Sequence, residues 1–124
     1  MQLLAMTAKG VGVGRLGVAT KQAPVIIPVN FTVRDHQIFI RLGFGLLSQT
    51  APGQLVAFEV DHIDWAAGTA WSVLARGLAT LIESPTEIES AEDPSPLVPE
   101  PGDMLLVVRA DVLTGRRFTI RNAT

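Results

Sequence analysis

Residues 11–33 read VGVGRLGVATKQAPVIIPVNFTV, and this stretch decides between two folds. Gly12, Gly14 and Gly17 form the pattern G-x-G-x-x-G, which in some proteins marks a loop that holds the pyrophosphate of a dinucleotide. Such a loop must open into a helix whose N-terminus faces the phosphate. The residues after Gly17 are rich in β-branched side chains and include two prolines, so they do not form that helix. We therefore predict a β-strand, in which the glycines bend the chain or let another backbone approach.

The composition of the chain excludes several classes of protein. The net charge is −2 and there is no basic run, so nucleic acid is not an expected partner. The chain has no cysteine, which excludes disulfides and thiolate chemistry. No apolar run reaches the ~18 residues that a membrane span needs, and no signal-peptide pattern is present, so we expect a cytoplasmic protein. The apolar fraction of 48% is high for a small domain and predicts a homo-oligomer.

Turn residues divide most of the chain into six segments dominated by Val, Ile, Phe and Thr. The short connection VRDHQ predicts a hairpin. Because closure removes exposed edges, six strands in one domain of residues 1–124 predict a small, mainly β barrel. The predicted strands are Val11–Thr20, Pro24–Val33, Gln37–Leu42, Gln54–Asp61, Ala70–Glu83 and Met104–Leu113.

Two short segments outside these strands are expected to be helical. GLLSQT (residues 45–50) suits one or two turns, and SPTEIESAED (84–93) begins with a capping-box pattern. A Pro-rich connector follows over residues 92–102.

Taken in order, VGRLGVAT, APVIIPVNFTV, IFIRLGFG, LVAFEVDHID, WSVLARGLAT and VLTGRRF resemble the pyridoxamine 5′-phosphate oxidase-like family of flavin-nucleotide-binding split barrels. The resemblance spans roughly residues 3 to 118. It implies a six-stranded split β-barrel with one or two short helices, and an obligate homodimer with cofactor grooves at the interface. Residues 1–10 then correspond to a remnant of the N-terminal helix that such proteins often carry.

The phosphate side of the implied cofactor site falls at the end of the third predicted strand. Arg41 matches the position of a phosphate-binding residue in the family, and a guanidinium offers an oxyanion a bidentate fork. Gly43 and Gly45 follow, and they let backbone N–H groups approach an anion. Ser48 adds a hydroxyl donor. The alternative is that Arg41 is a surface arginine beside an ordinary turn, without a role in phosphate binding.

The chain departs from the family pattern at this place. Leu42 stands where threonine is common and Leu47 where lysine is common. Loss of one charge-assisted contact costs about 1.5–3 kcal/mol. The departure therefore favours weak FMN binding, another cofactor, or none.

The ring side of the site is implied by the strand IIPVNF. Pro28, Val29 and Asn30 are the candidates there, mainly through backbone groups, with the Asn30 amide able to reach a polar ring edge. Trp71 is a further candidate, although a core or dimer-interface position explains it better than stacking on the ring. Arg76 is expected to pair with an acid of the FEVD segment, Glu59 or Asp61, with contact to the cofactor as the alternative.

The resemblance implies a flavin- or deazaflavin-dependent oxidoreductase that binds FMN or a deazaflavin coenzyme of the F-420 type and acts on an unidentified small molecule. The alternative is a non-catalytic flavin-nucleotide-binding or cofactor-free homologue. True pyridoxamine 5′-phosphate oxidase activity is the weakest of the three interpretations, because the chain lacks clustered basic residues for a second phosphate. The sequence identifies no metal site and no catalytic acid or base.

Overall fold

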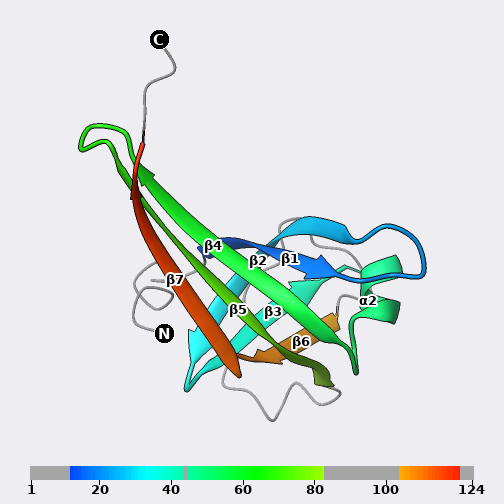
Figure 1. The fold of residues 1–124 in the computed structure, drawn as a ribbon. Coiled ribbons are helices and arrows are strands. Elements are labelled where there is room, and N and C mark those ends of the chain that lie inside the picture. The colour runs from blue at the N-terminus through cyan, green and yellow to red at the C-terminus, as the bar shows by residue number, and fades with distance from the viewer. Residues whose placement is uncertain (1–11, 44, 83–103, 121–124) are drawn as a thin grey trace.

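The computed structural model describes residues 12–43, 45–82 and 104–120. This part of the chain forms seven strands and one five-residue helix (Figure 1). Its elements are β1 (Gly12–Val18), β2 (Val25–Arg34), β3 (Gln37–Leu42), α2 (Leu46–Thr50), β4 (Leu55–Asp64), β5 (Thr69–Ile82), β6 (Met104–Arg109) and β7 (Val112–Thr119).

Six of the strands close into a barrel. Their order is β4-β1-β2-β3-β6-β5, and pairing of β4 with β5 completes the ring. All recorded pairs are antiparallel, and β7 adds to the free edge of β5 outside the ring. The predicted fold class is thus confirmed, as a six-stranded barrel with one extra strand and one short helix. No helix in the described ranges is long and apolar enough to cross a membrane.

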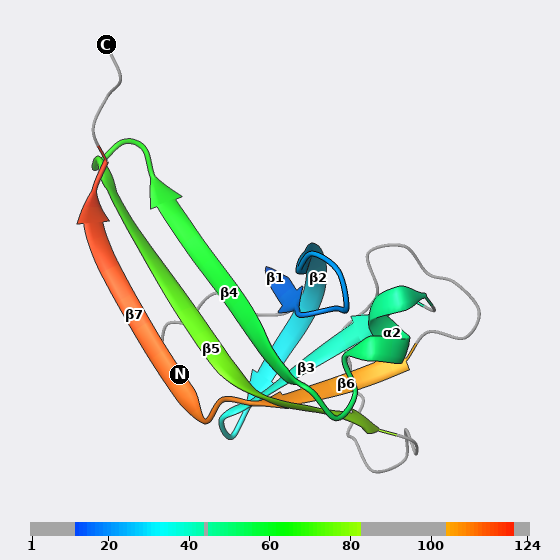
Figure 2. The ribbon, with the colours of Figure 1, turned by 45° about the vertical axis from the view of Figure 1, so that its right-hand side comes forward.

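Three strands run past the barrel as an extended arm (Figure 2). β4 pairs with β1 only over Ala57–Glu59, whereas its pairing with β5 continues to Asp64. We define the arm as residues 61–64 of β4, residues 69–76 of β5, and β7. All eight residues of β7 are exposed, and so are the last four of β4. The described part of the chain therefore leaves β7 and the end of β4 uncovered, whereas Ala70, Val73 and Ala75 of β5 are buried.

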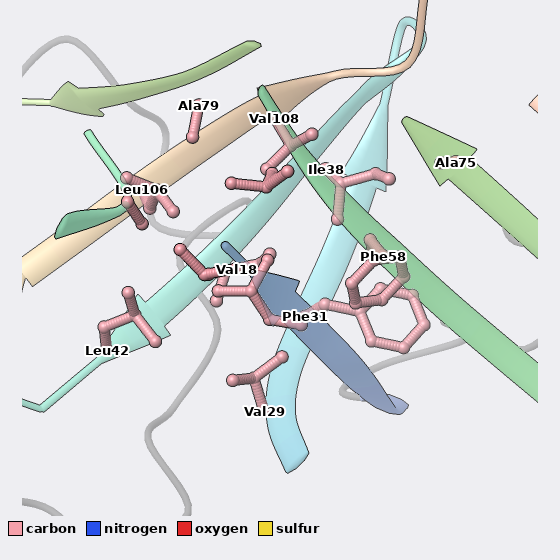
Figure 3. Close-up of a cluster of buried hydrophobic side chains, with 14 of the residues drawn as sticks. Val18, Val29, Phe31, Ile38, Leu42, Phe58, Ala75, Ala79, Leu106 and Val108 are labelled. Atoms are coloured by element: carbon pink, nitrogen blue, oxygen red, sulfur yellow. The ribbon is translucent and has the colours of Figure 1, made fainter. Parts of the chain in front are cut away.

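The barrel interior is filled by alternate residues of the strands (Figure 3). The rings of Phe31 and Phe58 meet edge to face with centroids 4.8 Å apart. Gly14 lies across from them in β1, and a Cβ built on it would overlap the ring of Phe58. This close contact, with a strand rather than a helix after Gly17, confirms the strand interpretation of the glycines.

The hairpin predicted at VRDHQ is also confirmed. Arg34 pairs with Gln37, and the two residues between them have positive φ, 51° at Asp35 and 63° at His36. Positive φ at both central residues is the conformation of a type I′ turn, whose twist matches that of the flanking strands.

The last predicted strand, Met104–Leu113, is wrong in its extent. The chain bends at Ala110 and Asp111, where the Asp111 N–H donates to the carbonyl of Arg109 (2.9 Å). The bend separates β6 from β7, and β7 continues to Thr119. Gly77 of β5 lies against the bend, and a Cβ there would overlap the Arg109 carbonyl. The helix prediction at GLLSQT is confirmed as α2, whereas those for residues 1–10, 84–93 and 92–102 lie outside the described residues.

Candidate functional site

Two of the predicted site residues lie at the same level on neighbouring strands. The last recorded pair of β2 and β3 in this direction is Phe31 with Ile40, and one step further come Asn30 and Arg41. Phe31 and Ile40 belong to the core, so strand alternation places Asn30 and Arg41 on the outer face of the barrel. Asn30 is nevertheless only 8% exposed, and the Nε atom of Arg41 is buried. The result is a sheltered amide and guanidinium side by side.

Pro28 extends this outer face along β2. It is exposed and lies opposite Arg15 of β1. Two strand residues span about 7 Å, so Pro28 and Asn30 form a short row pointing the same way. Val29 points the other way, into the core, where it is 3% exposed. Its side chain is therefore committed to packing, and only its backbone is available to a ligand.

Ser48 holds the beginning of α2. Its Oγ accepts a hydrogen bond from the Gly45 N–H (2.8 Å) and donates its proton to the Gly45 carbonyl (2.9 Å). The helix begins with the bond from the Gln49 N–H to the same carbonyl (3.2 Å). Because a serine hydroxyl has one proton, the predicted donation to a phosphate requires that its bond to Gly45 be given up. Gly43 is exposed directly after β3.

Trp71 lies in the arm, away from this group. Its strand, β5, pairs with β4, β6 and β7 but not with β2 or β3. Trp71 packs partly against the core and faces His62, with ring centroids 6.0 Å apart and an interplanar angle of 33°. Arg117 of β7 lies opposite it on the other side. These groups line a hollow of about 460 Å³, together with Asp64, Thr69 and Phe118.

The contribution of His62 and Arg117 to this hollow was not predicted. His62 could have been placed from the sequence, because a hairpin at DWAAGTA brings it opposite Trp71. Arg117 reaches the hollow only because β7 pairs with β5. That pairing joins residues 36 to 50 positions apart in the sequence and leaves no local signal.

The expected ion pair of Arg76 with Glu59 or Asp61 is wrong. Arg76 lies opposite Ala57 instead. Asp61 approaches Arg15, with 3.9 Å between its Oδ2 and an Nη of the arginine. Within the described ranges Arg76 has no ion pair or hydrogen bond.

Comparison with known proteins finds a matching family model and a similar bacterial protein. The family model described as pyridoxamine 5′-phosphate oxidase matches residues 6–115. The chain is 29% identical over 118 residues to Rv0080 of Mycobacterium tuberculosis, an uncharacterized protein, covering 90% of this chain and 78% of that one.

Two solved structures resemble the chain over nearly its whole length. One is the FAD binding protein from Mycobacterium smegmatis, which is 28% identical with a TM-score of 0.75 and coverage of 96% of this chain and 92% of that one. The other is a candidate pyridoxamine 5′-phosphate oxidase from Corynebacterium glutamicum, 31% identical with a TM-score of 0.76 and coverage of 96% and 94%. With a barrel of this topology and a family match over most of its length, the chain belongs to the pyridoxamine 5′-phosphate oxidase family.

Proposed function

We propose that this chain is a flavin-dependent oxidoreductase that binds its cofactor on the outer face of β2 and β3. The observation that carries the proposal is the sheltered pair Asn30 and Arg41 in a chain 28% identical to a protein described as FAD binding. When bound, a flavin supplies the redox chemistry by accepting and donating hydride equivalents. The protein then contributes position, charge and exclusion of water.

The residues present fit the phosphate of such a cofactor. A guanidinium offers two parallel N–H donors to an oxyanion, and the neighbouring amide of Asn30 adds a donor and an acceptor. Partial burial strengthens these bonds because less water competes for them. Pro28, exposed in the same row, offers a flat apolar surface to a ring.

The cofactor we expect is FMN, FAD or a deazaflavin coenzyme. FAD enters because the M. smegmatis relative is described as binding it. All three carry phosphate and a planar tricyclic ring, so the same outer face suits each of them. The substrate is a small molecule whose identity is open.

We further propose that the protein is a homodimer with the cofactor at the interface. The exposed arm supports this, because Ile63 and Phe118 are uncovered at 42% and 45% exposure, and Trp65 in the turn beside them at 73%. The hollow beside Trp71 lies in the same arm, and its guanidinium and aromatic groups suit a planar anion. In a dimer this hollow would face the partner chain.

A cofactor-free homologue is the second candidate. It is favoured by Leu42, whose side chain points into the core, and by Ser48, whose proton is engaged by Gly45. Both leave fewer polar groups for a phosphate than the family pattern implies.

Calorimetric titration of the full chain with FMN, FAD and the deazaflavin coenzyme in parallel tests these proposals. We expect saturable binding of one of them, and at least about tenfold weaker binding after Arg41→Ala, because a charge-assisted contact is lost. Arg34→Ala is the matched control, since Arg34 is exposed at the far end of the same hairpin. Failure of all three ligands to bind would favour the cofactor-free homologue. Reduction of the bound flavin by NADH or NADPH, followed as bleaching of its visible absorbance, tests the oxidoreductase activity separately.

Leu47→Lys provides a second test of the phosphate side. The variant restores the residue type that is common in the family at this position. We expect FMN to bind at least severalfold more tightly, because a lysine near the phosphate adds a charged contact. Unchanged affinity would mean that the phosphate lies elsewhere.

A further inference from the structure

A second hollow lies on the outer face of the barrel, where β1, β2, β4 and β5 meet the beginning of β7. We call it the outer hollow. Its volume is about 610 Å³, within the ~300–1,000 Å³ typical of small-molecule sites. Gly17 and Ala57 form its floor, while Ile26, Leu55 and Val112 stand around it at 69%, 76% and 44% exposure. So much exposed apolar surface in one concave place is unusual for an unoccupied surface.

The mostly apolar lining of the outer hollow includes one cationic side chain. Arg76 lines the outer hollow from β5, and in the described part of the chain it has no ion pair or hydrogen bond. The other charged group lining the hollow is Asp111, whose Oδ1 lies 3.4 Å from Nε of Arg109. The charge left uncompensated at the hollow is therefore positive, and it is complementary to an anion.

Gly17 gives independent evidence that something approaches the floor. A Cβ on Gly17 would meet its nearest neighbours, the Cβ and carbonyl of Ala57, at 3.7 Å, which is ordinary contact. Packing therefore does not require glycine here, in contrast to Gly14, where a Cβ would overlap Phe58. Glycine inside a strand weakens it and often marks a bulge, a bend, or close approach by a ligand or another backbone, and the unbroken register of β1 with β2 and β4 at Gly17 shows no bulge there.

The rim of the outer hollow is held in place by hydrogen bonds. In the connection between β1 and β2, Thr20 Oγ1 donates to the Ala23 carbonyl (2.9 Å) and accepts from the Gln22 N–H (3.0 Å). This turn positions Pro24 and the beginning of β2 at the hollow. The hollow is thus largely preformed, as ligand sites usually are.

We propose that the outer hollow binds a small amphipathic anion, with its carboxylate on Arg76 and its apolar body over Gly17 and Ala57. An aliphatic or aromatic monocarboxylate has this chemistry. Along β2, Ile26 lies four residues, or about 13 Å, from Asn30 at the proposed phosphate position, and two residues, or about 7 Å, from Pro28 at the proposed ring position. The proposed anion site does not depend on flavin binding.

Calorimetric titration of the flavin-free full chain with octanoate, octanol and octylammonium tests the proposal. The three probes share an apolar body and differ in charge. We expect octanoate to bind at least about tenfold more tightly than the other two, because only octanoate pairs with the guanidinium. Equal binding of octanol, or no binding of octanoate, would overturn the proposal.

Variants of Arg76 sharpen the test. Arg76→Gln should weaken octanoate binding at least about tenfold, and Arg76→Glu should reverse the preference toward octylammonium. Arg34→Gln is the matched control, an exposed arginine that pairs with Asp35 away from the hollow, and it should leave the affinity unchanged. Octanoate binding that is indifferent to Arg76 would contradict the assignment.

Gly17→Val tests the floor without threatening the fold. Valine favours a strand and a Cβ has room there, so thermal stability should be kept or raised. Its methyl groups should fill the floor and weaken octanoate at least severalfold. If instead Gly17→Val or Arg76→Gln lowers the oligomeric mass in sedimentation, while wild-type protein fails to bind octanoate, the outer hollow is an interface between copies and the proposal is wrong.

Discussion

The glycines of this barrel differ in how much room the structure leaves for a Cβ at each position. At Gly77 it would overlap the backbone carbonyl of Arg109, at Gly14 the side chain of Phe58, and at Gly17 nothing closer than 3.7 Å. A backbone atom in a sheet cannot move aside as a ring can. The same residue type therefore has a different reason at each place.

This ranking predicts the effect of alanine at each position on the free energy of unfolding. Gly77→Ala should destabilise the fold by about 3 kcal/mol or more, and Gly14→Ala by about 1–3 kcal/mol, as overpacking does. Gly17→Ala should be neutral or stabilising by up to about 1 kcal/mol, because alanine loses less backbone entropy on folding. Urea unfolding of the three variants measures the order. A loss at Gly17 equal to that at Gly77 would contradict it.

For individual residues, the sequence identified the important positions but not the contacts that make them important. The spacing of Gly12, Gly14 and Gly17 was visible at once, and the following residues excluded a phosphate loop. That Gly14 makes room for Phe58 depends on the pairing of β1 with β4, across some forty residues of sequence. Likewise Ser48 was predicted as a ligand donor, whereas its bonds to Gly45 become visible only with the turn in place.

Among the elements, the hairpin between β2 and β3 carries avoidable strain. Asp35 and His36 both adopt positive φ, which residues with a side chain rarely do. Replacing the pair with Asn-Gly, the preferred sequence of a type I′ turn, should stabilise the protein by about 0.5–1 kcal/mol. Among the described residues, His36 bonds outward only through its carbonyl, which accepts from the Ala110 N–H (3.0 Å), so this contact is kept; the exposed Arg34–Asp35 ion pair is lost but contributes little. Thermal unfolding measures the gain, and Ala-Ala at the same positions should instead destabilise.

The short helix α2 depends on one side chain. Ser48→Ala removes both bonds between its hydroxyl and Gly45, so we expect a loss of about 1–2 kcal/mol in the free energy of unfolding. Gln49→Ala, one position further on an exposed surface, should change it by less than about 0.5 kcal/mol. Denaturant unfolding of both variants provides the comparison, and equal effects would show that the bonds to Gly45 contribute little.

The first five strands were predicted within three residues of their observed bounds, because turn residues separate them clearly. The boundary between β6 and β7 was missed because RADV contains no glycine or proline. The bend carries a local bond from the Asp111 N–H to the Arg109 carbonyl and a distant one from the Ala110 N–H to the His36 carbonyl, and it lies against Gly77 of β5. Local sequence patterns do not predict a strand break that involves contacts with distant residues.

For the molecule as a whole, the apolar composition predicts a surface covered in an oligomer, and the structure shows an exposed arm that can be this surface. The high apolar fraction predicted an oligomer without saying which face is covered. The structure leaves all of β7 and the end of β4 exposed, with large apolar side chains at Ile63 and Phe118 on one face of the arm and at Leu113 on the other. The strand pattern and the resemblance both predicted the barrel, whereas the extent of the arm follows from long-range pairing that local patterns do not encode.

The arm therefore yields a prediction about assembly. Sedimentation should give the wild-type protein twice the chain mass of 13.3 kDa. Leu113→Asp should shift it toward the monomer, because a carboxylate buried without a partner in an interface costs several kcal/mol. Leu78→Asp is the control: Leu78 lies in β5 outside the arm with similar exposure, 45% against 38% for Leu113. The control should remain dimeric.

Flavin titration of the same variants separates assembly from cofactor binding. If the cofactor lies at the interface, Leu113→Asp should lose flavin affinity in step with dimer mass, although Asn30 and Arg41 are untouched. Wild-type protein that sediments as a monomer would exclude the arm as a stable interface. Full flavin affinity in a monomeric Leu113→Asp protein would instead show that a single barrel holds the cofactor, with the outer face of β2 and β3 sufficient by itself.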